Sequence, residues 1–175
     1  RSTRPVGVAP SRKGAATRHS KTSSMQESMS ITDIMAALPH RYPFLLIDRL
    51  VKIEGETKAH GIKQLTHNEE FFQGYFPDDP QMPPTLMAEA MAQVGAAVIM
   101  SKPDSEGKYI LFGALDNAEF HRNPRPGERL DIEAEMLKLR KDVGKTRIIC
   151  CIDGEEIARA DFMFALSADV SAGAP

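Results

Sequence analysis

The sequence lacks the features of a membrane, metal-binding or disulfide-bonded protein. No apolar run approaches the roughly 18 residues that a membrane-spanning helix needs. The two cysteines, Cys150 and Cys151, are neighbours, and adjacent strand residues point to opposite faces, so we expect no disulfide between them. No Cys-x-x-Cys spacing occurs. The sequence therefore predicts a chain of the cytoplasm or an organellar matrix that is not secreted, spans no membrane and holds no metal or cofactor.

Acidic residues are absent from the first 26 positions, which hold six Lys and Arg instead. The whole chain has 22 basic and 24 acidic residues, so positions 27–175 keep 16 basic residues and a net charge of −8. We expect residues 1–29 to be a basic extension outside the folded domain. Three interpretations stay open: a tag or disordered tail, the remnant of an organellar targeting segment, or an arm that binds RNA or an acidic protein.

Residues 30–167 have the pattern of one globular domain, followed by a short tail over 168–175. Hydrophobic residues make up 42% of the chain and charged residues 26%, which is ordinary for a soluble globular protein. Ser30 followed by Asp33 predicts the start of a short helix. We expect a loop over 71–84, and strands over 44–53, 57–65, 109–120, 130–140, 146–152 and 156–166.

The segment from Pro84 to Met100 is the most distinctive part of the pattern. Its only polar side chains are Thr85, Glu89 and Gln93, and proline is tolerated at the first position of a helix. A helix that is apolar all round must be buried on all sides. In a domain of this size, the remaining strands must then wrap around it. The sequence therefore predicts an α+β fold in which an antiparallel sheet surrounds one long central helix.

Glu89 is the one carboxylate inside this apolar helix, and Gln93 lies four residues on, on the same face. A carboxylate buried there must be paired, hydrogen-bonded or neutralised. Such a group can serve as a general acid. The alternative is a structural carboxylate that caps a buried loop amide.

Several motifs resemble those of the (3R)-hydroxyacyl-acyl carrier protein dehydratases, the FabZ-like family. They are LPHRYPFLLIDR at 38–49, FFQGYFP at 71–77, Met82-Pro83, EAMAQ at 89–93, Phe112-Gly113, Pro126-Gly127-Glu128 and Phe164-Ala165-Leu166. The resemblance covers residues 30–167. It implies a hot-dog fold, a homodimer or higher homo-oligomer such as a trimer of dimers, and acyl thioesters on acyl carrier protein as substrates.

In that family, a histidine abstracts the α-proton of the 3-hydroxyacyl thioester, and a carboxylate from the other subunit protonates the leaving hydroxyl. A backbone N–H at the start of the central helix binds the thioester oxygen. The resemblance implies that Glu89 is the carboxylate. It also implies that the substrate contacts come from Gln93, Phe72, Gly74 and Phe76.

Two positions depart from the family pattern. Tyr75 stands where the family has its catalytic histidine, and a tyrosine is a donor rather than a base at neutral pH. Pro84 stands where the family has the glycine of the oxyanion site, and proline has no N–H. Loss of one oxyanion donor lowers a rate about a hundredfold or more. Loss of the base costs at least a comparable factor.

None of the other histidines considered has the motif context of a replacement base. We interpret His40 as structural, since the family also carries histidine there, and we expect His60, His67 and His121 to be solvated. Two hypotheses follow. The first is a catalytically impaired domain kept for acyl-chain binding or as a structural subunit of a larger assembly. The second is an active dehydratase or related acyl-thioester enzyme that uses Glu89, with Tyr75 in an altered role.

Overall fold

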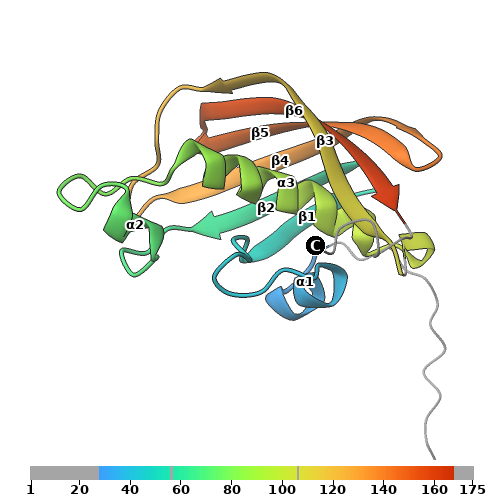
Figure 1. Cartoon of the computed structure of the whole chain (residues 1–175), viewed down its shortest axis with the longest axis horizontal. Helices are drawn as coiled ribbons and strands as arrows, with labels where there is room; N and C mark the ends of the chain where they lie inside the picture. Colours follow the sequence, from blue (N-terminus) through green and yellow to red (C-terminus); the bar gives the residue numbers. More distant parts are fainter. Residues whose placement is uncertain (1–27, 56, 106, 168–175) are drawn as a thin grey trace, which may run out of the picture.

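A six-stranded antiparallel sheet with one long helix along its concave face forms the domain (Figure 1). The computed structural model describes residues 28–55, 57–105 and 107–167. The sheet order is β1-β2-β4-β5-β6-β3. The elements are α1 (Ile31–Ala37), β1 (Arg49–Glu54), β2 (Lys58–Gln64), α2 (Phe71–Gly74), α3 (Pro84–Met100), the 3-10 helix η1 (Pro103–Ser105), β3 (Tyr109–Phe120), β4 (Arg129–Arg140), β5 (Val143–Ile152) and β6 (Glu155–Ser167).

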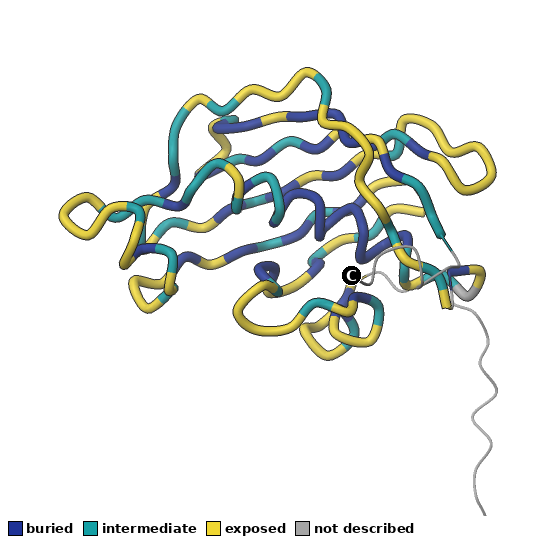
Figure 2. Tube along the Cα trace, in the orientation of Figure 1, coloured by how far each residue is buried: buried dark blue, intermediate teal, exposed yellow. Residues whose placement is uncertain are grey.

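Helix α3 is the centre of the hydrophobic core. Every residue from 90 to 99 is buried, and the helix contacts β2, β3, β4 and β5 (Figure 2). Gly61 of β2 permits the closest approach of the helix, because a Cβ there would lie 2.4 Å from Cγ2 of Val94. The predicted α+β fold with a sheet around a central helix is confirmed.

The predicted boundaries are confirmed for most elements and wrong for two. The segment expected to be a strand from residue 44 becomes one only at Arg49. Before that point, the backbone of Phe44 and Leu46 hydrogen-bonds with the side chain of Gln93 instead of with a neighbouring strand. The region 71–84, expected to be entirely loop, contains α2, whose Phe72 is buried in the core.

The N-terminal boundary of the domain lies slightly before Ser30. Ser30 caps α1 in a capping box with Asp33, as predicted. Met29 is buried and exchanges two backbone hydrogen bonds with Leu50, at 2.9 and 3.0 Å. Residues 1–27 of the predicted basic extension and the predicted tail over 168–175 lie outside the described residues.

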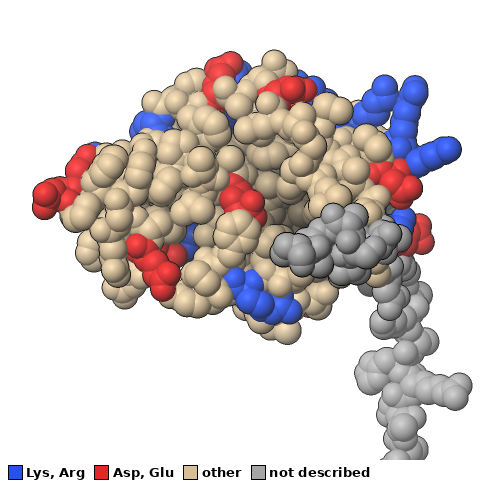
Figure 3. Space-filling view, in the orientation of Figure 1, with Lys and Arg blue, Asp and Glu red and all other residues tan. Residues whose placement is uncertain are grey.

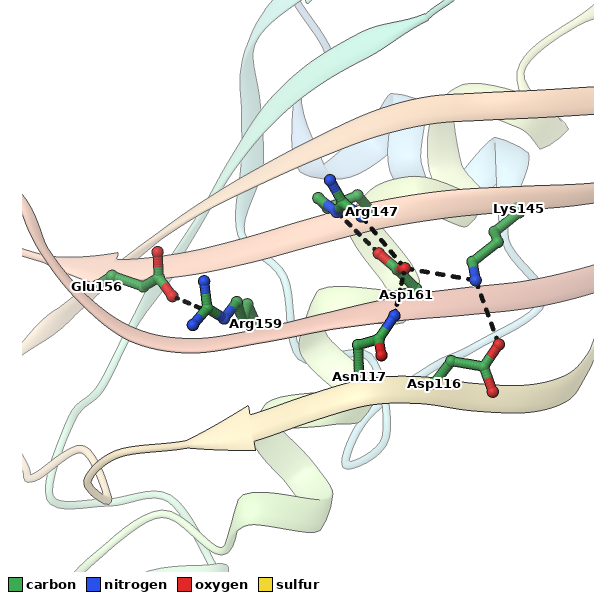
Figure 4. A network of polar contacts seen from close by, with 7 residues as sticks. All are labelled: Asp116, Asn117, Lys145, Arg147, Glu156, Arg159 and Asp161. Carbon is green, nitrogen blue, oxygen red and sulfur yellow. Dashed lines mark hydrogen bonds and ion pairs between the residues drawn. The ribbon is translucent and has the colours of Figure 1, made fainter.

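Polar side chains cover the convex face of the sheet. Asp161 of β6 has a side chain only 4% exposed, and it accepts hydrogen bonds from Arg147 of β5 and Asn117 of β3 at 2.9 and 3.0 Å (Figure 4). Lys145 lies 3.4 Å from the same carboxylate and also pairs with Asp116 of β3. These contacts join the edge strand β3 to the middle of the sheet.

The two cysteines lie in β5 and are both free. Burial raises the pKa of the Cys150 thiol to about 12, which makes it unreactive at neutral pH. Cys151 is half-buried, in keeping with the alternation of a strand.

Among the described helices, none combines the length and the apolarity needed to cross a bilayer.

Candidate active site

Glu89 and Gln93 lie one turn apart on α3 and form the centre of the candidate site. The Gln93 side-chain nitrogen donates to Glu89 Oε1 at 2.7 Å. Gln93 is fully buried, whereas the Glu89 side chain is 24% exposed. The expectation of a buried Glu89 is therefore only partly correct for a single chain: the carboxylate lies at the edge of the core, with Oε1 held by the protein.

The Gln93 amide is held by the segment that precedes β1. Its Oε1 accepts from the Leu46 backbone N–H at 2.9 Å, and its Nε2 donates to the Phe44 carbonyl at 2.7 Å as well as to Glu89. These contacts span almost 50 residues of sequence, so no local pattern could reveal them. The predicted role of Gln93 as a substrate contact stays a prediction, while the bonds seen here orient Glu89.

His40 is a site residue that sequence reasoning set aside. Its Nε2 lies 3.8 Å from Glu89 Oε1, and its ring is tilted against that of Phe44 with centroids 5.6 Å apart. Its Nδ1 is buried and has no hydrogen-bond partner among the described residues. The segment 38–49 therefore contributes the backbone groups that bind Gln93 and the imidazole that lies near Glu89. In the sequence, the family motif at 38–49 was the only indication that this segment belongs to the site.

Tyr75 caps the C-terminus of α2, at the start of the loop that leads to α3. Its N–H donates to the Phe71 carbonyl at 3.0 Å, and its carbonyl accepts from the Gln81 N–H at 2.8 Å. Its ring stacks on that of Phe76 with centroids 4.4 Å apart. The half-buried Tyr75 and the exposed Phe76 thus form one aromatic pair, and no hydrogen bond joins Tyr75 to Glu89 in the part of the chain that the structure describes.

The loop after Tyr75 is tied to the segment that follows β3. Asp79 pairs with Arg125, Asn123 donates to Gln81 at 3.0 Å, and the Met82 N–H donates to the Pro124 carbonyl at 2.7 Å. The hydrogen bond from Arg125 holds the pKa of the Asp79 carboxyl below its usual value. These contacts hold the loop in one position relative to the sheet.

The remaining predicted residues fall into different surroundings. Phe72 is in the hydrophobic core, because α2 packs that side chain inward, and its predicted substrate contact stays a prediction. Gly74 is exposed at the end of α2. Pro84 is the first residue of α3, so the first N–H of that helix is missing, and the next amides belong to Thr85 and Leu86.

Of the other histidines, His60 differs from its expectation. It lies 3.1 Å from an Asp131 carboxylate oxygen on the convex face, so it is partnered rather than simply solvated. His67 is exposed, and His121 is exposed between Glu119 and Glu156, at 3.9 and 3.8 Å. Neither was expected to take part in the site.

A groove of about 810 Å³ lies between the C-terminal end of α1, the end of α3 and the start of β3. Apolar side chains along it include Met35, Leu38 and Ile110, and His40 lies on its wall. On the face of the molecule that carries α3 and β3, most charged atoms lie toward the margins (Figure 3). The groove thus adjoins the Glu89 cluster through His40.

Comparisons with known proteins agree with this arrangement. A family model for the FabA-like domain matches residues 38–161. The solved dehydratase heterocomplex ApeI:P from Xenorhabdus doucetiae has the same fold, with a TM-score of 0.65 and 14% identity over 77% of this chain and 90% of that one. A mutant thioesterase from Pseudomonas aeruginosa gives a TM-score of 0.58 at 14% identity over 79% of this chain and 94% of that one. These structural likenesses establish a hot-dog fold and nothing about chemistry.

Curated relatives are much more similar in sequence. A 3-hydroxyacyl-[acyl-carrier-protein] dehydratase FabZ from Halalkalibacterium halodurans is 45% identical over 138 residues, which cover 79% of this chain and 99% of the relative. The protein of the same name from Caldicellulosiruptor saccharolyticus is 46% identical over 136 residues, covering 78% and 97%. The chain therefore belongs to the FabZ-like family of hot-dog dehydratases.

Proposed function

We propose that this chain binds 3-hydroxyacyl thioesters carried on acyl carrier protein and dehydrates them only very slowly, so that acyl binding or assembly is its main role. The relatives named as dehydratases support the substrate class. The observation that carries the proposal is a contrast within the site. Gln93 fixes the position of Glu89, the family's carboxylate, while positions 75 and 84 offer a phenol and a proline.

The contrast matters because the three parts of the reaction are chemically distinct. An acid must protonate the leaving hydroxyl, a base must take the C2 proton, and a donor must stabilise the thioester oxygen. Glu89 can supply the first. The Tyr75 phenol is a poor base at neutral pH, and Pro84 removes the amide that starts α3. Two absent parts should lower the rate by about four orders of magnitude if their effects multiply.

The groove beside α3 supports acyl binding. Its volume of about 810 Å³ lies within the usual range of small-molecule sites, and Met35, Leu38 and Ile110 give it an apolar part that suits a hydrocarbon chain. Arg41, Lys102 and Lys108 also line it, and Arg41 and Lys108 already bind the Leu38 carbonyl and Asp142, so this part of the wall is polar. We assign the acyl chain to this groove within the proposed function.

We further propose that the chain works as a homodimer. Strand β3 is an edge strand that pairs only with β6 in the described part of the chain, and Leu111, Phe112 and Leu115 on it are exposed. An open edge with exposed apolar side chains readily pairs with another strand. A second copy could then bring its own Tyr75 loop toward Glu89, which would explain why the two are separate within one chain.

Restoration of the two altered positions tests the proposed impairment. The variants Tyr75→His, Pro84→Gly and the double variant are compared with the wild type by hydration of a crotonyl thioester. We expect almost no turnover from the wild type and a larger gain from the double variant than from either single one, because the two changes supply different parts of one transition state.

Glu89→Gln in the double variant is the control, and it should abolish the gain. A wild-type turnover of about 1 per second or above is ordinary for an enzyme. That result would contradict the impairment and favour the second hypothesis, an active acyl-thioester enzyme in which Glu89 works with Tyr75 in an altered role. The observation that favours this alternative is the hydrogen bond from Gln93 to Glu89, which holds the carboxylate in a fixed position.

A further inference from the structure

The hydrogen bonds around Gln93 determine which oxygen of Glu89 can carry a proton. The Gln93 carbonyl oxygen accepts from the Leu46 N–H, so the orientation of its amide is settled. Its NH₂ group then donates both hydrogens, one to the Phe44 carbonyl and one to Glu89 Oε1. The carbonyl oxygen of a carboxylic acid is its stronger acceptor, so this contact favours the hydrogen of a protonated Glu89 on Oε2.

His40 approaches the same oxygen. Its Nε2 lies 3.8 Å from Glu89 Oε1, and its Nδ1 is buried without a partner among the described residues. A buried N–H without an acceptor is rarer in proteins than an under-used acceptor. In the neutral tautomer with hydrogen on Nε2, that hydrogen is directed toward Glu89 Oε1 and Nδ1 is unprotonated. Protonation of both nitrogens would instead create an orphaned buried N–H.

Several charged side chains lie around His40. The neighbouring Arg41 guanidinium is held by the carbonyls of Met35, Leu38 and His40 at 2.6 to 3.0 Å. Lys102 and Lys108 line the same groove, and Lys108 pairs with Asp142 at 3.1 Å. Glu89 is the acidic group in contact with the ring.

We propose that His40 is a positioning residue that acts through Glu89. As the neutral Nε2–H tautomer, it joins Gln93 in holding Oε1 as an acceptor, so that Oε2 alone gives its proton to the substrate hydroxyl. This inference rests on the proposed function. The 3.8 Å separation is longer than a direct hydrogen bond, and contacts of this kind are often long without substrate and tighten in the complex.

The proton transfer is balanced without a further cofactor. The Oε2–H bond of Glu89 breaks as a bond forms from its hydrogen to the hydroxyl oxygen. Water leaves with the electron pair of the C3–O bond. The C2–H pair becomes the double bond, and the C2 proton passes to a water molecule, since Tyr75 is no base. The hydronium ion so formed returns a proton to Glu89, so that no proton is gained or lost.

The first test is spectroscopic and needs no activity. Protein labelled with ¹⁵N-histidine is examined by long-range ¹H–¹⁵N correlation at neutral pH, and His40→Ala assigns the His40 signals. We expect a hydrogen on Nε2 with a bare Nδ1, and a slowly exchanging Nε2–H proton that disappears in Glu89→Ala. His121→Ala, which removes an exposed histidine, should leave the signal unchanged. A hydrogen on Nδ1, or on both nitrogens, would overturn the inference.

The second test is kinetic and uses both the wild type and the Tyr75→His/Pro84→Gly variant. We expect His40→Ala to lower kcat about tenfold with little change in KM, and His40→Gln to recover part of the loss because its amide can donate. Equal effects of alanine and glutamine would contradict a donor role. If neither background turns over substrate, the proposed function fails, while the Nε2–H signal still decides whether His40 holds Glu89.

Discussion

Asp161 illustrates how a single residue can be stabilised on the convex face of the sheet. Its carboxylate is almost completely buried and receives hydrogen bonds from Arg147 and Asn117 as well as the charge of Lys145 (Figure 4). The hydrogen bond from Arg147 is the main cause that lowers the pKa of this carboxyl to about 2. The pKa of Arg147 is raised in turn by the same bond.

The lowered pKa predicts a specific pH dependence of stability. A carboxyl group whose folded pKa lies below its unfolded value stabilises the fold above the unfolded pKa, and this stabilisation is lost as the pH falls through the folded pKa. We therefore expect Asp161→Asn to lower the free energy of unfolding by about 1–2 kcal/mol at pH 7. The difference from the wild type should shrink between about pH 4 and pH 2.

Urea denaturation across this pH range checks the expectation. Asp78→Asn is the matched control, because Asp78 is an exposed carboxylate of the loop before α3. It should shift stability little and without the same pH dependence. A constant difference between wild type and Asp161→Asn down to pH 2 would show that the loss comes from packing and not from the ionised carboxylate.

At the scale of elements, the contact of α3 with β2 depends on Gly61. A Cβ at this position would lie 2.4 Å from Val94 Cγ2 and 3.1 Å from Leu50 Cδ2. Val94 is β-branched and stiff, so it cannot rotate away cheaply. The helix must therefore move outward or the side chains must leave their preferred rotamers.

We expect Gly61→Ala to destabilise the domain by about 1–3 kcal/mol, as overpacking usually does. Val94→Ala alone should also destabilise, because it leaves a cavity. The double variant should lose less than the sum of the two, since the new methyl group occupies space that Val94 vacates. If the two losses in free energy of unfolding add up in the double variant, the contact between position 61 and Val94 does not limit how closely α3 approaches β2.

At the scale of the whole molecule, the exposed apolar residues of β3 predict the oligomeric state. Leu111 is 55% exposed and Leu115 is 45% exposed on an edge strand. We expect a dimer in light scattering after gel filtration, and a monomer when both leucines are replaced by lysine, because charged edge strands resist pairing. The variant should remain folded, since neither side chain belongs to the described core.

Leu139→Lys is the control for this experiment. Leu139 is also 45% exposed, but it lies in β4, away from the β3 edge. Its replacement should leave the dimer intact. If Leu139→Lys dissociates the dimer and the β3 variant does not, the interface lies at the β4–β5 end of the sheet.

The predicted basic extension allows one further test on the intact chain. Six basic and no acidic residues within positions 1–26 favour binding to a negative partner, either RNA or an acidic protein surface. Removal of residues 1–24 should weaken attachment to such a partner without lowering thermal stability, and rising salt should weaken attachment of the full chain. Association that survives both changes would exclude an electrostatic role for the extension.

Much of the fold could be predicted from local sequence. The apolar segment from Pro84 to Met100 determined the buried helix, and the capping box determined the start of α1, because both depend on residues close together in the chain. Family motifs located Glu89, Tyr75 and Pro84. Whether Tyr75 and Pro84 impair the chemistry stays a prediction.

Only the tertiary structure decided how the Glu89 cluster is assembled. Gln93 reaches back to Phe44 and Leu46, and His40 comes within 3.8 Å of Glu89, because the segment before β1 crosses α3. These contacts are long-range and involve side-chain directions that no periodicity encodes. The same limit explains the shortened β1, since a strand pattern cannot reveal that its first residues will bind a helix side chain instead of a neighbouring strand.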